Sequence, residues 1–175
     1  GNAGVEAATN QTVERAASTM MWFVYAIVVF MCWLTFRFSI AAVICVITPL
    51  VLTSILCEAL MTVLGMGLKV GTLPVIALGV GIGVDYGIYI YSKMQEFLAQ
   101  GQSLEEAYFH TLCVTGKAVT FTAVSLAVGV GTWIFSDIKF QADMGILLTF
   151  MFVWNMVGAM WLLPAMADLL VKVQI

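Results

Sequence analysis

The sequence predicts an all-α membrane protein, a five-span helical bundle with one interfacial amphipathic helix. Hydrophobic residues make up 62% of the 175 residues, charged residues make up only 10%, and the mean hydropathy is +1.05. Soluble domains carry roughly 25% charged residues, whereas a membrane helix needs about 20 consecutive, mostly apolar residues. Five runs of that kind, joined by short connections, fill most of this chain. We therefore expect no room for a soluble domain.

The five runs place the spans at about residues 20–36, 40–64, 73–94, 118–135 and 142–170. Pro49 lies inside the second span and should kink it, because proline cannot donate the helical hydrogen bond. Asn155 lies well inside the fifth span, where a carboxamide usually forms a hydrogen bond between helices.

Residues 1–18 are small and polar. We expect them to be the end of an extracytoplasmic domain that enters the first helix. The chain is then expected to be a piece of a longer polypeptide, because it begins without a leader of the usual kind.

The polar insertion between the third and fourth spans predicts a short helix at about residues 104–115. Ser103 and Glu106 have the spacing of a capping box, and Gly116 is expected to end the helix. Apolar residues recur on one side of this segment. That pattern favours a helix that lies in the membrane interface.

Several function classes are disfavoured. The net charge of -3 is spread over short loops without a basic run, so we expect no nucleic-acid partner. The four cysteines lack the spacings of metal sites or disulfide frameworks, and the glycines fit no nucleotide-binding fingerprint. We therefore expect no metal and no cofactor.

Asp85 lies at the middle of the third span and is the first candidate for function. A charged side chain at the bilayer centre costs roughly 2.5–3.5 kcal/mol on insertion scales. Such a residue therefore persists where a helix bundle or a water path receives it. Tyr86 follows it directly.

Helical geometry gives this span two sides. At about 100° per residue, Gly79, Gly83 and Gly87 form a small-residue stripe nearly opposite Asp85, and such stripes allow close helix packing. The other side lies within about 40° of Asp85 and carries Gly81, Tyr89 and Ser92. We count Gly81 among the packing glycines as well. Tyr86, about 100° from Asp85, is expected to share a hydrogen bond with an adjacent helix.

Reversible protonation suits a carboxyl in this position, because an apolar environment favours its neutral form and hydration favours its charged form. Tyr86 or Tyr89 would orient it. Two alternatives stay open: Asp85 forms a fixed ion pair with another helix, or it is a structural carboxyl held by hydrogen bonds.

Further polar residues suggest a secondary pathway. Glu58 lies near the far end of the second span, where it either reaches water at the interface or takes part in a polar pathway. Thr122 and Ser125 recur with Gly129 along one side of the fourth span. Small and hydroxyl residues at that spacing usually indicate close helix packing.

The motifs around Asp85 resemble a known family. They are GVGIGVDYGIYI at 79–90, TLPV at 72–75, EEA at 105–107, TGKAVTFTAVSLAVGVGTW at 115–133, FSDIKFQADMG at 135–145 and LLPA at 162–165. Together they are similar to the resistance-nodulation-division (RND) superfamily. The similarity is to its lipid-exporting branch, which includes the mycobacterial large membrane proteins and the hopanoid-associated exporters.

The resemblance implies that the chain is half of a twelve-span RND fold, the C-terminal half, in a bacterial cytoplasmic membrane. It implies that Asp85 and Tyr86 are one half of a proton relay, and that a matching Asp-Tyr pair lies on the other, N-terminal half. Protons and a hydrophobic or lipid substrate would be the partners, with membrane lipid around the bundle. A homo-oligomer is left open.

Two other classes are weighed against an exporter. A sterol-sensing or lipid-binding module is built on a similar five-span unit and would bind lipid without a proton gradient. An intramembrane aspartyl protease is suggested by GIGVD at 81–85, which resembles the GxGD signature. However, the spacing is wrong by one residue and no second membrane-embedded aspartate accompanies it. We therefore expect no enzyme and no catalytic residues.

Overall fold

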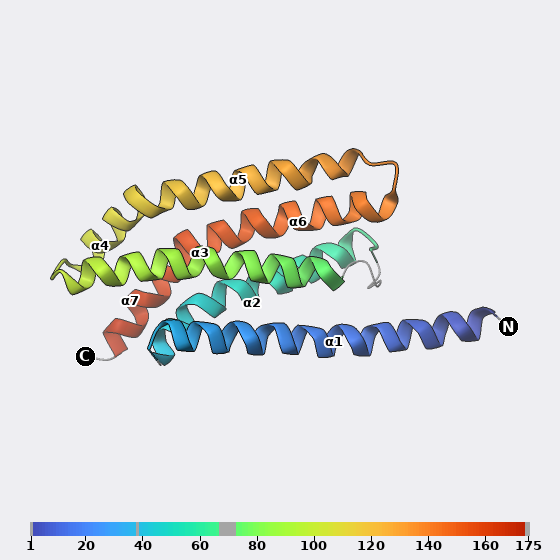
Figure 1. Ribbon diagram of the computed structural model, residues 1–175, viewed down its shortest axis with the longest axis horizontal. Coiled ribbons are helices and arrows are strands. Elements are labelled where there is room, and N and C mark those ends of the chain that lie inside the picture. Colours follow the sequence, from blue (N-terminus) through green and yellow to red (C-terminus); the bar gives the residue numbers. More distant parts are fainter. Residues whose placement is uncertain (1, 38, 67–72, 174–175) are drawn as a thin grey trace.

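The computed structural model (Figure 1) describes residues 2–37, 39–66 and 73–173, with side chains described at 19–37, 39–66 and 75–170. These residues form helices and turns and contain no strand, which confirms the all-α membrane bundle. The helices Ile40–Val63, Val75–Ala99, Leu104–Phe135 and Lys139–Leu170 are each long and apolar enough to cross a bilayer. The apolar helix Thr19–Thr35 is shorter, but a helix of its length can still span.

Helices α1 (Asn2–Thr35) and α2 (Ile40–Val63) form an antiparallel pair joined by a tight turn. Arg37 makes the turn with a φ of 50°, and the Ser39 hydroxyl accepts a hydrogen bond from the Ala42 amide to begin α2. The Tyr25 and Ser54 hydroxyls are 2.6 Å apart and link the two helices. Residues 2–18 belong to α1, but their side chains lie outside the described part, so their place in an external domain stays a prediction.

Helix α3 (Leu73–Ala99) is five residues longer than the predicted span 73–94. The extension carries Glu96, whose carboxylate accepts from the Lys93 ammonium at 2.7 Å. Lysine, glutamine and glutamate are good helix formers, so the helix continues after the apolar run has ended. It stops before Gly101, whose φ of 86° ends the helical path.

The capping box before α4 (Leu104–Thr111) is confirmed. The Ser103 hydroxyl accepts from the Glu106 amide at 3.3 Å, and the Glu106 carboxylate accepts from the Ser103 amide at 3.1 Å. Ala107, on the apolar side of α4, is buried, and α4 packs on α3. The position of α4 at the membrane interface stays a prediction.

The predicted end of this helix at Gly116 is wrong. A π-helix, Leu112–Gly116, carries the chain from α4 into α5 (Lys117–Gly131) without a break. Gly116 has a helical φ of -58°. The glycine provides space rather than a turn, because an added Cβ would lie 3.2 Å from the Met160 methyl group.

The predicted fifth span is one long helix with a bend. It runs through α6 (Lys139–Val157), a second π-helix at Gly158–Leu162, and α7 (Leu163–Val173). Gly158, at the bend, lies against Pro49 of α2, where an added Cβ would be 3.0 Å from the proline Cβ. In Figure 1, α7 turns away from the line of α6 and passes behind α3.

Helix α3 occupies the centre of the bundle. It packs against α1, α2, α4 and α6, whereas α5 packs mainly against α6 and leaves most of its surface exposed. In Figure 1, α5 and α1 lie on opposite sides of the molecule, with α3 and α6 between them. The helix with the candidate aspartate is therefore the one that the other helices hold in place.

Candidate functional site

One side of α3 is held closely by its neighbours through glycines. A Cβ added at Gly79 would collide with the Met151 side chain of α6, and one added at Gly83 would collide with Asn155 of α6. The same Cβ at Gly83 would lie 2.7 Å from Cδ2 of Leu50 on α2. These two glycines therefore let α3 approach α6 and α2 more closely than any other residue would.

The stripe continues at Gly87 but does not include Gly81. A Cβ at Gly87 would lie 2.9 Å from Cγ1 of Val46 on α2. At Gly81 an added Cβ would meet nothing within 4 Å, and the residue is exposed. Gly81 therefore packs against no described residue. It lies on the opposite side of α3 from Gly79, Gly83 and Gly87, so its role as a packing glycine stays a prediction.

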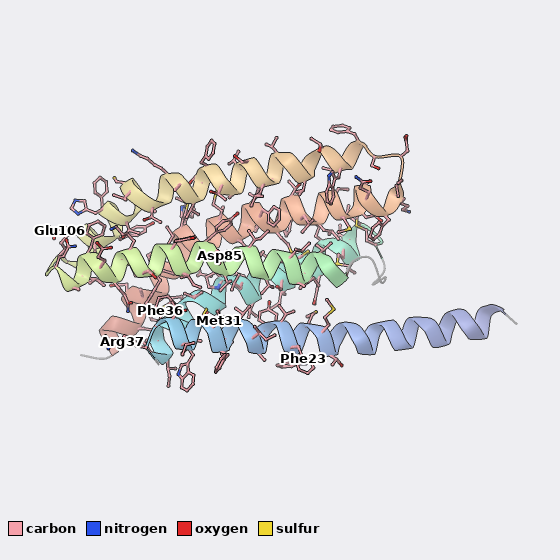
Figure 2. All side chains as sticks on the ribbon, viewed as in Figure 1. Phe23, Met31, Phe36, Arg37, Asp85 and Glu106 are labelled. Atoms are coloured by element: carbon pink, nitrogen blue, oxygen red, sulfur yellow. The ribbon has the colours of Figure 1, made fainter. Side chains whose placement is uncertain are left out.

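The opposite side of α3 is a polar face that no described helix covers. Asp85, Tyr89 and Ser92 are all exposed, and Tyr89 exposes 62% of its side chain. Figure 2 shows Asp85 near the middle of α3. Its carboxylate has no ion pair or hydrogen bond with any residue in the described part of the chain. We call Gly81, Asp85, Tyr89 and Ser92 the free face of α3.

Tyr86 is buried although it follows Asp85 directly. Only 3% of the residue is exposed, and its hydroxyl has no hydrogen-bond partner among the described residues. Within the described residues, the predicted hydrogen bond to an adjacent helix is therefore not formed, and a bond to a helix outside this chain stays a prediction. Tyr86 lies seven residues after Gly79, almost two full turns, so it is on the same side of α3 as that glycine.

Asn155 of α6 forms the interhelical hydrogen bond that the sequence predicts. Its side-chain Nδ2 donates to the Gly79 carbonyl at 2.8 Å, and the residue is only 2% exposed. Its Oδ1 has no partner among the described residues. Asn155 therefore has one polar atom paired with α3 and one unpaired among the described residues.

The residues of the suggested secondary pathway are not brought together. Glu58 is exposed on α2. Thr122 and Ser125 are exposed on α5, which lies on the side of the bundle opposite α1 in Figure 1.

The packing side of α5 also differs from the predicted one. An added Cβ at Gly129 meets nothing within 4 Å, and the buried residues of α5 are Val119, Ala123 and Ala127. In the described chain, the hydroxyl stripe of α5 therefore faces outward.

One polar link was not predicted. The Tyr108 hydroxyl of α4 donates to the Met160 carbonyl at 2.8 Å, and Met160 lies inside the second π-helix. A π-helix changes the hydrogen-bonding register, which no periodicity in the sequence reveals. No group of three or more metal-ligating side chains occurs within the described ranges.

Comparison with known proteins gives matches over the whole chain and over shorter parts of it. The model of the MMPL family matches residues 1–174. The trehalose monomycolate exporter MmpL3 of Mycobacterium tuberculosis is 44% identical over 52 residues, which are 29% of this chain and 6% of that protein. The membrane protein YdfJ of Bacillus subtilis is 24% identical over 92 residues, 53% of this chain and 13% of that protein. No solved structure gives a significant match.

Proposed function

This chain belongs to the MMPL family, and we propose that it is one transmembrane half of a proton-driven RND exporter of lipids or other hydrophobic molecules. It is a multi-pass protein of the bacterial inner membrane. Its matches cover only small parts of the relatives, 6% of MmpL3 and 13% of YdfJ.

The exposed position of Asp85 carries this proposal. Its helix is held on its other sides by α1, α2 and α6, and yet its carboxylate lies on the free face without a partner in the described chain. Leaving that face in contact with lipid would incur the cost of a charged group in hydrocarbon, about 2.5–3.5 kcal/mol or more. A second polar element is therefore needed to cover it, and the other half of the transporter, with its own Asp-Tyr pair, would meet that need.

Asp85 then acts by changing its charge. In the neutral form the carboxyl donates one hydrogen bond, and in the ionised form it only accepts, so each state favours a different arrangement of the two halves. Gly79, Gly83 and Gly87 bring α3 into close contact with α2 and α6. A shift of α3 that follows protonation would therefore be passed to both helices.

The nature of the substrate is inferred from the relatives. MmpL3 of Mycobacterium tuberculosis is named as an exporter of trehalose monomycolate, a lipid, and MmpL3 of Mycolicibacterium smegmatis, 42% identical over 52 residues, carries the same name. We infer a lipid or another hydrophobic molecule for this protein too.

The test is the substitution Asp85→Asn in the full-length transporter, reconstituted in vesicles with a proton gradient. We expect export to stop, because the carboxamide cannot take up or release a proton, while expression and insertion are unchanged. The matched control is Glu96→Gln, which removes a carboxylate from an exposed turn of the same helix and should leave export intact. Normal export by the Asp85→Asn protein, or export that persists after an uncoupler is added, would contradict the proposal.

A further inference from the structure

The outer surface of α5 carries a groove that the proposed relay does not use. Its volume is about 480 Å³, and it lies between the first π-helix, the start of α5 and the second π-helix. In Figure 1, α5 lies along one edge of the bundle, and only 17% of the membrane-length apolar stretch in Leu104–Phe135 is buried. The groove therefore opens to the surroundings of the bundle, which for an apolar membrane helix include lipid.

The floor of the groove is formed where the two π-helices approach each other. Gly116 is buried there, and an added Cβ would lie 3.2 Å from both Cδ2 of Leu112 and Cε of Met160. The Thr120 hydroxyl donates to the Gly116 carbonyl at 2.8 Å and lies 3.6 Å from the Met160 sulfur. Because its proton is already bonded within the helix, the floor offers a ligand mainly apolar surface.

The wall of the groove is one side of α5, which changes from charged to apolar along its length. Lys117, Phe121 and Val124 occupy positions i, i+4 and i+7 and so lie on the same side of the helix. Phe121 is 76% exposed, Val124 is 48% exposed, and Lys117 is exposed as well. Val124 is about 10 Å further along the axis than Lys117. The groove therefore has a cationic end and an apolar remainder.

Lys117 lies at the depth of the lipid headgroups. Residues 117 to 135 rise about 27 Å along the helix, close to the roughly 30 Å thickness of the hydrocarbon core. A lysine at such an end lays its stem on apolar surface and keeps its ammonium at the interface. Lys117 forms no ion pair within the part of the chain that the structure describes. Its counter-charge must therefore come from another molecule or segment.

We propose that this groove binds an anionic phospholipid of the bilayer, with the phosphate on the Lys117 ammonium and one acyl chain along Phe121 and Val124. A molecule that is anionic at the interface and apolar below it complements both parts of the groove. The contact between ammonium and phosphate is a charge-assisted hydrogen bond, which is stronger than a neutral one. The volume falls within the roughly 300–1,000 Å³ of small-molecule pockets.

The charge of the headgroup follows from the same lysine. A choline or ethanolamine headgroup would bring a second cation close to Lys117, and like charges repel at that distance, whereas phosphatidylglycerol adds none. The site lies on α5 and the second π-helix, apart from the free face of α3, and it does not rest on the proposed function. The bound chain would cover Met160 and so support the contact between the two π-helices.

The test is photolabelling of the full-length transporter in phosphatidylcholine vesicles that contain a small fraction of phosphatidylglycerol with a photoreactive acyl chain. Mass spectrometry of the digested protein identifies the labelled residues. We expect label within residues 117–124. This labelling should saturate, and an excess of unlabelled phosphatidylglycerol should remove it, because one site is filled against a background of phosphatidylcholine.

Three variants assign the label to this groove. Lys117→Gln should reduce it about tenfold, because the headgroup loses a hydrogen bond to a charged group. The matched control Lys139→Gln removes an exposed lysine at the start of α6 and should leave the label unchanged. Val124→Trp keeps the lysine but fills the apolar part of the groove, and it should reduce the label as well. Thermal unfolding confirms that each variant is folded.

The outcomes separate a binding site from ordinary lipid contact. Equal labelling of 117–124 by photoreactive phosphatidylcholine, or labelling that Lys117→Gln does not change, would overturn the proposal. Label elsewhere in the transporter but none at 117–124 would also overturn it, because a protein segment would then cover the groove. Asp85→Asn should be labelled like the unaltered protein whatever its export activity, so this result does not depend on the proton relay.

Discussion

At the residue scale, Gly81 and Gly83 are two positions apart on α3 and have different surroundings. Gly83 lies against Asn155 and Leu50, where an added Cβ would collide with both side chains, whereas Gly81 faces open space. Glycine in the middle of a helix costs roughly 0.5–1 kcal/mol relative to alanine. At Gly83 the closer packing compensates for that cost, and at Gly81 no described residue does so.

Gly83→Ala should therefore destabilise the protein by about 1–3 kcal/mol, the usual cost of overpacking a filled core. The displaced carboxamide of Asn155 would also lose its hydrogen bond to Gly79. Thermal unfolding in detergent measures the effect. The control is Gly129→Ala on α5, where an added Cβ meets nothing and helix propensity favours alanine by about 1 kcal/mol. A Gly83→Ala protein as stable as the Gly129→Ala protein would contradict this packing.

At the element scale, the two π-helices lie against each other. The first connects α4 to α5, and the second connects α6 to α7. A Cβ added at Gly116 of the first would lie 3.2 Å from the methyl group of Met160 in the second, and the Thr120 hydroxyl lies 3.6 Å from the Met160 sulfur. The Tyr108 hydroxyl closes the contact by donating to the Met160 carbonyl. The contact therefore links α4 and the start of α5 to the π-helix between α6 and α7.

Tyr108→Phe should weaken this contact, because the Met160 carbonyl loses its side-chain donor. We expect a loss of about 0.5–1.5 kcal/mol, the net value of one hydrogen bond. Hydrogen exchange measured by mass spectrometry should become faster in α4 and in Gly158–Leu162. Exchange in the first turn of α2, which Ser39 caps independently, should not change. Faster exchange throughout the bundle, or unchanged exchange in α4 and in Gly158–Leu162, would contradict a local effect of this hydrogen bond.

At the scale of the whole molecule, α3 has a polar free face and α5 has an apolar exposed side. Tyr89 is 62% exposed beside Asp85, and Phe121 is 76% exposed on α5. Both side chains are large, but only the first belongs to a face with a carboxylate. Our proposal places the other half of the transporter against α3 and leaves Phe121 to lipid.

Spin labels at these two positions test that arrangement in the full-length protein. A label on Tyr89→Cys should be immobilised and shielded from dissolved oxygen, because the other half covers it, whereas a label on Phe121→Cys should be mobile and accessible to oxygen in the bilayer. The variants need a Cys113→Ser background, since Cys113 is the exposed cysteine, while Cys32, Cys45 and Cys57 are buried. Equal accessibility at the two positions would contradict the predicted cover over α3.

The sequence by itself determined the membrane class, the approximate helices, the capping box at Ser103 and the hydrogen bond that Asn155 makes between helices. These features depend on local composition and on helical periodicity, which a single chain displays directly. The central place of Asp85 also follows from its position within an apolar run, although its role as a relay remains a prediction.

Only the tertiary structure decided which sides of the helices face protein. It placed Gly81 and the Thr122 and Ser125 stripe outward, packed α4 onto α3, and buried Tyr86. The physical reason is that apolar and small residues occur all around a membrane helix, so periodicity cannot distinguish a lipid-facing side from a packed one. The neighbours of a helix are settled by close contacts such as Gly83 with Asn155, and these depend on residues 72 positions apart in the chain.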